Sequence, residues 1–179
     1  MKILFLYLSA FSTNGGIEKF NKAFMKALAE NEEATALKVM SSHDNICDER
    51  YLSQNKFKGF NGSKVIFSME AVAEAGKFDK IIFGHINLAP LALLIKKLYP
   101  KKHLTLITHG IEVWNELSSI KKNFLDCVDE IISVSNFTKD KLIQTHSINS
   151  DKIRILSNTI DPYFQITQDF SKPDYLMQR

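Results

Sequence analysis

The sequence has few of the features that mark secreted, metal-binding or membrane-spanning proteins. Only two cysteines occur among its 179 residues, Cys47 and Cys127, far apart and without Cys-x-x-Cys or Cys/His ligand spacing. We therefore expect free thiols in a reducing compartment, rather than a disulfide or a cysteine-based zinc site. The longest apolar run, Leu88–Ile95, is too short to cross a bilayer.

An excess of charge of one sign is also missing. The chain has 23 Lys and Arg against 20 Asp and Glu, a formal net charge of +3, and its lysines are spread along the sequence. This balance argues against nucleic-acid binding and leaves contact with a membrane surface open. The apolar start, Met1–Leu8, lacks a signal-peptide exit and predicts a strand. A cytoplasmic protein is expected, either free or peripheral on the inner face of the membrane.

Repeats are absent, and the chain instead alternates short apolar runs with helical periods. At 45% hydrophobic residues it is expected to form one core with a Rossmann-like α/β fold and a doubly wound parallel sheet. Segment 41–62 is long for a loop, so it is either functional or contains a strand near Phe57–Phe60. The expected strands are Lys2–Leu8, Ala36–Met40, Lys80–Phe83, Leu104–Thr108, Glu130–Val134 and Ile153–Leu156. The expected helices are Ile17–Asn31, 64–75, Leu88–Tyr99, Asn115–Asp126 and Asn136–His146.

The chain is organised around residues 104–114. The apolar run Leu104–Thr108 stops at His109, which places this histidine at the carboxyl end of a buried strand, where open α/β sheets carry their chemistry. Gly110 lets the backbone turn, and Glu112 adds a carboxylate one turn further on. His85 follows another strand, so both histidines should approach the same edge of the sheet. No carboxylate or third histidine stands beside them at ligand spacing, so no metal site is expected.

A glycine pair opens the first predicted helix. Gly15 and Gly16 follow the first strand and its loop, so the free amides of the helix start could receive a phosphate. The pair does not fit the patterns G-x-G-x-x-G or G-x-x-x-x-G-K-[ST], which argues against an NAD-binding or P-loop domain. Taken alone, a glycine pair is explained equally well by an ordinary turn.

Polar residues after the later strands have plainer explanations. Ser135 and Asn136 begin a helix, where an N-cap is the simpler role. Asn158 and Asp161 follow the last strand, where turn residues are common. Trp114 is either a platform for a sugar or part of the core, and a single aromatic at this position is more often core.

Five segments together resemble family 4 of the retaining glycosyltransferases, in the same order along the chain. They are Gly15–Glu18, His85, Thr108–Trp114, Val134–Leu142 and Ile155–Asp161. The resemblance implies a GT-B fold, two Rossmann-like domains facing a cleft, with residues 1–165 as the N-terminal, acceptor-binding domain. Residues 166–179 would begin the linker to the C-terminal domain, which in the family binds the nucleotide sugar. The family's Asn-Gly-Val-Asp pattern reads Asn-Thr-Ile-Asp here, at positions 158–161.

The resemblance also implies roles for individual residues. Gly15 and Gly16 would present backbone amides to the donor diphosphate, and His109 would lie near the transferred sugar and act in catalysis. The donor would be a nucleotide-diphosphate sugar, with no metal or other cofactor, and the acceptor a glycan, a lipid-linked or a small molecule. His85, Asn87 and Glu112 are candidates for acceptor contacts, and Glu18, Ser135, Asn136 and Asn158 are further cleft candidates.

Three functions remain open. The preferred one is retaining transfer of a hexosyl unit in polysaccharide or glycolipid biosynthesis, with this piece inactive until joined to its C-terminal domain. The alternative is a stand-alone sugar- or nucleotide-binding module without turnover. A dehydrogenase or flavodoxin-like domain is disfavoured by the missing phosphate fingerprints. A lysine cluster, Lys96, Lys97, Lys101, Lys102, Lys121 and Lys122, is either a solvated helix end or a surface for anionic lipid.

Overall fold

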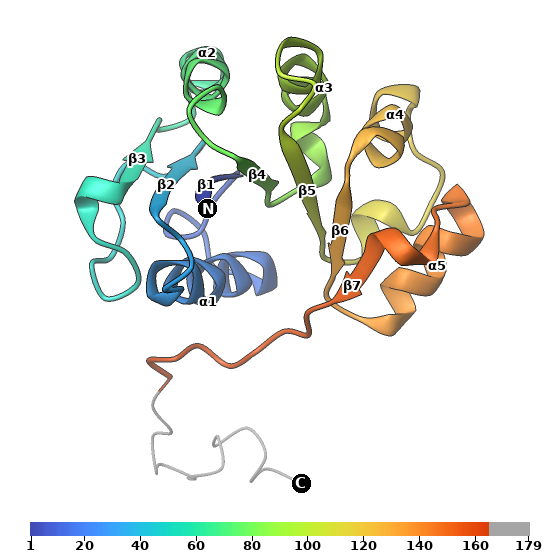
Figure 1. The fold of residues 1–179 in the computed structure, drawn as a ribbon. Helices are drawn as coiled ribbons and strands as arrows, with labels where there is room; N and C mark the ends of the chain where they lie inside the picture. Colours follow the sequence, from blue (N-terminus) through green and yellow to red (C-terminus); the bar gives the residue numbers. More distant parts are fainter. Residues whose placement is uncertain (165–179) are drawn as a thin grey trace, which may run out of the picture.

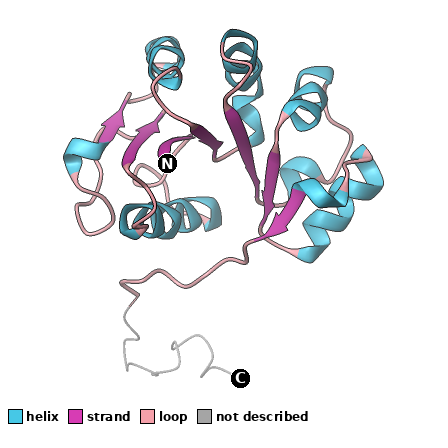
Figure 2. Ribbon diagram, in the orientation of Figure 1, coloured by secondary structure: helices cyan, strands magenta, loops and turns pink. Residues whose placement is uncertain are grey.

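The computed structural model describes residues 1–164, which form a parallel sheet with helices on both faces (Figure 1, Figure 2). Its seven strands lie in the order β3-β2-β1-β4-β5-β6-β7, and every neighbouring pair is parallel. This order confirms the predicted Rossmann-like, doubly wound fold. The strands are β1 Lys2–Tyr7, β2 Ala36–Ser41, β3 Phe57–Gly59, β4 Lys80–Phe83, β5 His103–Thr108, β6 Glu130–Ser133 and β7 Ile153–Ile155. The α-helices are α1 Gly16–Glu30, α2 Lys64–Ala75, α3 Ala89–Leu98, α4 Ser119–Cys127 and α5 Asn136–His146.

Helices α1 and α2 pack on opposite faces of the sheet, with α3 and α4 beside α2 (Figure 1). Successive side chains of β1 point to opposite faces: Leu4 and Leu6 join the core under α2 and α3, whereas Phe5 and Tyr7 join the core under α1. A central parallel strand is covered on both sides, which explains why its sequence is an unbroken apolar run. None of the helices in residues 1–164 is long and apolar enough to span a membrane.

Most expected elements are confirmed to within two residues, including the short strand in segment 41–62, which is β3. The predicted start of the fourth helix, α4, was wrong. It begins at Ser119 rather than Asn115, because a 3₁₀ turn, η3 (Ile111–Val113), follows β5 and buries Val113. Likewise the helix expected from Leu88 starts as a 3₁₀ turn, η2 (Ile86–Leu88), before α3. Two further 3₁₀ turns are η1 (Gln54–Lys56) and η4 (Ser150–Lys152).

Ser63 and Gly76 flank α2 as the sequence suggests, but neither ends the helix by the usual capping interaction. Ser63 precedes α2, but its hydroxyl makes no capping hydrogen bond. Gly76 ends α2 in a right-handed conformation, with φ of −60°. A Cβ at Gly76 would lie 3.1 Å from the Tyr99 ring, so packing rather than a left-handed turn favours glycine there. Residues 166–179, expected to begin a linker, lie outside the described residues.

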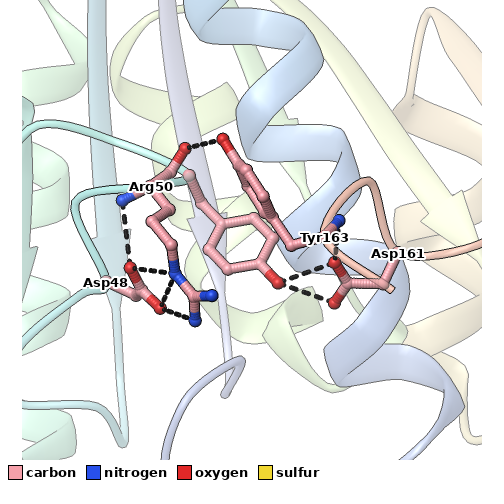
Figure 3. Close-up of polar contacts among 5 residues, drawn as sticks. Asp48, Arg50, Asp161 and Tyr163 are labelled. Atoms are coloured by element: carbon pink, nitrogen blue, oxygen red, sulfur yellow. Dashed lines mark hydrogen bonds and ion pairs between the residues drawn. The ribbon is translucent and has the colours of Figure 1, made fainter. Parts of the chain in front are cut away.

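After β7 the chain runs back below α1 toward the other edge of the sheet, which is formed by β3 (Figure 1). We call residues 156–164 the return segment. Its end contacts the loop before β3, where the Tyr51 hydroxyl donates to both carboxylate oxygens of Asp161 at 2.8 and 2.6 Å (Figure 3). The Tyr163 hydroxyl donates to the Arg50 carbonyl at 2.7 Å. These bonds join segments about 110 residues apart in sequence.

In the Tyr51–Asp161 pair, Asp161 is an ionised carboxylate and Tyr51 is a protonated phenol. Burial and the adjacent Asp161 carboxylate raise the pKa of Tyr51 to about 12, so the phenol keeps its proton and remains a donor. Burial alone would raise the pKa of Asp161, but the hydrogen bonds from Tyr51 and from the Tyr163 amide outweigh it and lower that pKa. The return segment is therefore fixed by a charge-assisted hydrogen bond.

Tyr51→Phe removes the hydroxyl that holds Asp161. We expect the unfolding free energy to fall by about 1 kcal/mol, because a half-exposed charged acceptor loses one donor. Hydrogen exchange at the Tyr163 and Phe164 amides, which donate to Asp161 oxygens, should become faster. Tyr99→Phe, on the other face of the sheet, is the matched control. Unchanged exchange in the Tyr51 variant would show that the pair does not hold the return segment.

Candidate functional site

The strand order reverses between β1 and β4, and this switch point brings the predicted site residues to one edge of the sheet. The glycine pair follows β1, His85 follows β4 and His109 follows β5, at the carboxyl ends of three adjacent strands. Open α/β sheets bind ligands in the crevice outside such a switch point. The geometry of each loop decides what this edge can bind.

The loop after β1 is built on a buried carboxylate, Asp44, which no sequence pattern marks as functional. Asp44 Oδ2 accepts a hydrogen bond from the Ala10 amide at 2.8 Å, and Oδ1 accepts from the amides of Phe11 and Ser12 at 3.0 and 2.7 Å. The Ser41 hydroxyl donates to Oδ2 at 2.8 Å. Three consecutive amides of this loop are thus directed at one side chain from the loop after β2.

Asp44 stays ionised despite its position. Its side chain is 1% exposed, and burial by itself raises the pKa. The hydrogen bonds from Ser12, Ser41 and Phe11 together outweigh burial, so the pKa of Asp44 lies below its usual value. The loop is consequently anchored by charge-assisted bonds over the whole physiological pH range.

The glycine pair and Glu18 form the start of α1. Glu18 Oε1 accepts hydrogen bonds from the hydroxyls of Ser9 at 2.8 Å and Thr13 at 2.9 Å. A Cβ at Gly15 would lie 2.5 Å from Glu18 Oε2, so a larger residue there would displace the end of the Glu18 side chain, whereas a Cβ at Gly16 would meet nothing within 4 Å. No side chain caps this helix start. Gly16 is therefore the more open of the two positions for a ligand.

Glu18 limits which ligand group can approach. Burial tends to raise the pKa of Glu18, but the hydrogen bonds from Ser9 and Thr13 lower it below its usual value. A charged carboxylate beside Gly15 repels a second anion at that position and accepts hydrogen bonds from hydroxyl groups. An anion would be placed best at the Gly16 side of the helix start.

His109 lies at the end of β5, but its imidazole is half-buried rather than free at the sheet edge. Nε2 lies 3.0 Å from the Gly84 carbonyl, and the ring makes an edge contact with Phe20 at a centroid distance of 5.1 Å. A carbonyl only accepts, which assigns the proton to Nε2 and leaves Nδ1 as an acceptor. Burial lowers the pKa of His109, while the Gly84 carbonyl and the carboxylates of Glu112 and Glu18 act in the opposite direction.

His85 has the same tautomer, but its other nitrogen is the free one. Its Nδ1 accepts a hydrogen bond from the Asn87 amide at 3.0 Å, which leaves the proton on Nε2. The rings of His85 and His109 lie 6.5 Å apart and are inclined by 29°. Burial lowers the pKa of His85. The site thus has two neutral imidazoles side by side, one with a free N–H donor and one with a free nitrogen acceptor.

The turn after His109 uses two of the predicted residues for its own geometry. Gly110 has φ of +153°, which favours glycine, and a Cβ there would lie 3.2 Å from Trp114. Glu112 Oε1 accepts a hydrogen bond from the His109 amide at 2.5 Å. One oxygen of Glu112 is therefore occupied in closing the turn that positions His109.

The remaining candidates are not brought into this group. Ser135 is the predicted N-cap of α5 and accepts from the Thr138 amide at 3.1 Å. The indole of Trp114 donates to the Thr138 hydroxyl at 3.2 Å, so Trp114 packs as a structural residue. Asn136 and Asn158 have exposed side chains, the latter within the return segment.

A cavity of about 330 Å³ is lined in part by Asn87, whose backbone amide donates to His85. Its walls come from the loops after β1 and β2, the first turns of α2, and the η2–α3 segment. Because four segments distant in sequence contribute to the cavity, no local sequence pattern predicts it. Asn87, predicted to contact an acceptor, and Leu88 belong both to this cavity and to the η2 turn.

Asp44→Asn tests the anchoring of the loop after β1. An asparagine would turn an NH₂ group toward backbone amides that need an acceptor, so we expect a loss of about 2–3 kcal/mol, or roughly 4–10 °C in melting temperature. The wild-type chain, whose Asp44 pKa is lowered on folding, should lose this stabilisation as pH falls from about 3.9 through the folded pKa. The control is the exposed Asp126→Asn. Equal melting temperatures for the two variants would contradict this role of Asp44.

The histidine pair should titrate below the ordinary histidine pKa of about 6.5. Because the folded pKa values of His85 and His109 are lowered, the unfolded chain binds more protons below that pH. Stability should therefore rise with pH from the folded pKa values to about 6.5 and then level off. Titration of the imidazole C–H resonances by NMR measures this directly. A pKa above 6.5 for either ring would refute the assignment of two neutral imidazoles.

Comparison with known proteins agrees with this architecture. The Anabaena protein Alr3699/HepE, solved in complex with UDP and glucose, is 17% identical, with a TM-score of 0.63 over 89% of this chain and 45% of that one. The lipopolysaccharide outer core galactosyltransferase WaaB is 16% identical, with a TM-score of 0.58 over 89% of this chain and 46% of that one. A glycosyltransferase from Rickettsia africae is 14% identical, with a TM-score of 0.59 over 87% of this chain and 42% of that one.

The chain spans less than half the length of these solved structures, and its fold is that of one half of a GT-B glycosyltransferase. No curated protein matches its sequence. The sequence model described as Glycosyltransferase Family 4 matches residues 14–164, which include the glycine pair, both site histidines and the return segment. The chain therefore belongs to Glycosyltransferase Family 4.

Proposed function

We propose that this chain is the N-terminal, acceptor-side half of an enzyme that transfers a hexosyl unit from a nucleotide-diphosphate sugar with retention of configuration. The observation that carries the proposal is the meeting, at one switch-point edge, of an uncapped helix start at Gly16 with the neutral pair His85 and His109. Helix amides suit a diphosphate, and neutral imidazoles suit hydroxyl groups. Membership of Glycosyltransferase Family 4 supports the class of reaction.

Sugar transfer requires that the charge of the departing diphosphate be stabilised while an acceptor hydroxyl is held at the sugar carbon. The Gly16 amide would meet the diphosphate, and Glu18 would accept hydrogen bonds from sugar hydroxyls on the other side of Gly15. His109 Nδ1 would accept a hydrogen bond from the acceptor hydroxyl, and His85 Nε2 would donate to a neighbouring oxygen. Fixed amides and imidazoles supply these interactions, so we propose a reaction that needs no metal ion.

The remaining half of the donor site would come from the enzyme's own C-terminal domain, placed by the linker that follows the return segment. This chain covers less than half of the solved structures that resemble it, which supports a two-domain enzyme. We propose that the 179-residue chain alone does not transfer sugar, because one face of the cleft would be missing.

We propose that the acceptor is a glycan or a lipid-linked molecule. We also propose that the enzyme contacts the inner face of a membrane peripherally. The lysine cluster supports it only in part. Lys96 pairs with Asp129 at 3.1 Å, and Lys102 donates to the Gly76 carbonyl at 2.9 Å. Lys97 and Lys101 are exposed and remain available to anionic lipid.

His109→Ala, made in a protein that joins this chain to its C-terminal domain, tests the proposed function. We expect turnover to fall about a hundredfold with donor affinity unchanged within a few fold, because the lost contact is made mainly in the transition state. The Gly84 carbonyl loses its partner, so a loss of about 1 kcal/mol in stability should accompany it. His103→Ala, at the opposite end of β5, is the control.

Wild-type turnover in a His109 variant that melts at a lower temperature would assign His109 a structural role only. Donor binding without any transfer by the wild-type two-domain protein would favour the alternative, a sugar- or nucleotide-binding module.

A further inference from the structure

The cavity beside Asn87 has a composition that selects for one class of ligand. Its floor is apolar and includes Phe67, Leu88 and Leu91, which are 2%, 7% and 7% exposed. Its rim is polar, with His43, Lys64 and Asn87. No carboxylate is among the lining residues within the described chain. The cavity is thus apolar inside and basic at the rim.

Lys64 is placed where a helix by itself does not favour a cation. It is the first residue of α2, at the positive end of the helix dipole, and the first turn contains no acidic residue to balance it. The acidic residues further along α2 are already paired, Glu70 with Lys58 at 2.6 Å and Glu74 with Lys77 at 2.9 Å. An anionic group in the cavity would supply the missing counter-charge.

The surface next to the rim is apolar as well. Val65, Ile66 and Met69, on the first turns of α2, are 71%, 57% and 70% exposed. An apolar portion of a ligand that leaves the cavity beside Lys64 would have these side chains to lie on. Apolar floor, basic rim and apolar exit together match an amphiphilic anion.

We propose that this cavity binds a phosphate group attached to an apolar portion of the acceptor, and that Lys64 is the residue that selects the phosphate. The inference rests on the proposed function in taking this ligand as the acceptor. A rim with the Lys64 ammonium and the N–H donors of His43 and Asn87 holds an oxyanion better than a neutral hydroxyl. The acceptor hydroxyl would then extend past Asn87 toward His85 and His109.

Binding of small probes to the 179-residue chain tests this site without any turnover. The probes are n-hexyl phosphate, n-hexyl β-glucoside and inorganic phosphate, and the dissociation constants come from amide chemical-shift changes. We expect n-hexyl phosphate to bind at least tenfold more tightly than n-hexyl glucoside, with the largest shifts at residues 64–68 and 87–91. Lys64→Gln should remove this preference, whereas Lys77→Gln, at an exposed lysine that follows the other end of α2, should keep it.

Equal affinities for the phosphate and the glucoside, or an unchanged preference in Lys64→Gln, would overturn the proposal. Inorganic phosphate distinguishes the source of the anion: binding as tight as that of n-hexyl phosphate would overturn the role of the apolar floor and indicate a free-phosphate site. Weaker binding of inorganic phosphate supports an amphiphilic ligand. His109→Ala should bind n-hexyl phosphate normally, so a failure of the proposed transfer reaction and a failure of this site give different results.

Discussion

Asp44 accepts hydrogen bonds from the amides of Ala10, Phe11 and Ser12, and the geometry of the site depends on this cluster. Three consecutive backbone N–H groups that converge on one point need an anion there, since leaving them unpaired in a buried place is costly. The carboxylate belongs to the loop after β2, so it ties the ends of the two strands together. The chain then reaches the start of α1 in a defined position, with the Ser9 and Thr13 hydroxyls directed at Glu18.

The second constraint is the desolvation of the two histidines. Because both rings are half-buried, protonation is disfavoured. Their fixed partners, the Gly84 carbonyl and the Asn87 amide, place the proton on Nε2 in both rings and leave opposite nitrogens free, Nδ1 of His109 and Nε2 of His85. The Asn87 amide belongs to η2, which replaced a regular helix start expected from sequence, and the Gly84 carbonyl directly follows β4. Local irregularity at the end of β4 thus supplies the fixed partners of both histidines.

Strand patterns made the sheet predictable. A central parallel strand such as β1 or β5 is apolar on both faces, and this is visible as an unbroken run that ends at a polar residue. The position of His109 followed from where such a run stops. Asp44 did not stand out, because an aspartate in a polar loop carries no local signal and the amides that it binds lie more than 30 residues away. The Tyr51–Asp161 pair and the cavity beside Asn87 are hidden for the same reason, since each is assembled from distant segments.

Amide hydrogen exchange of the wild-type chain tests most directly whether the loop after β1 is fixed before any ligand binds. We expect slow exchange at Ala10, Phe11 and Ser12, whose amides are held by Asp44, and fast exchange at Gly16, whose amide has no side-chain cap. Exchange of the three loop amides at the rates of an unstructured peptide, under conditions where β1 and β4 remain protected, would contradict this expectation.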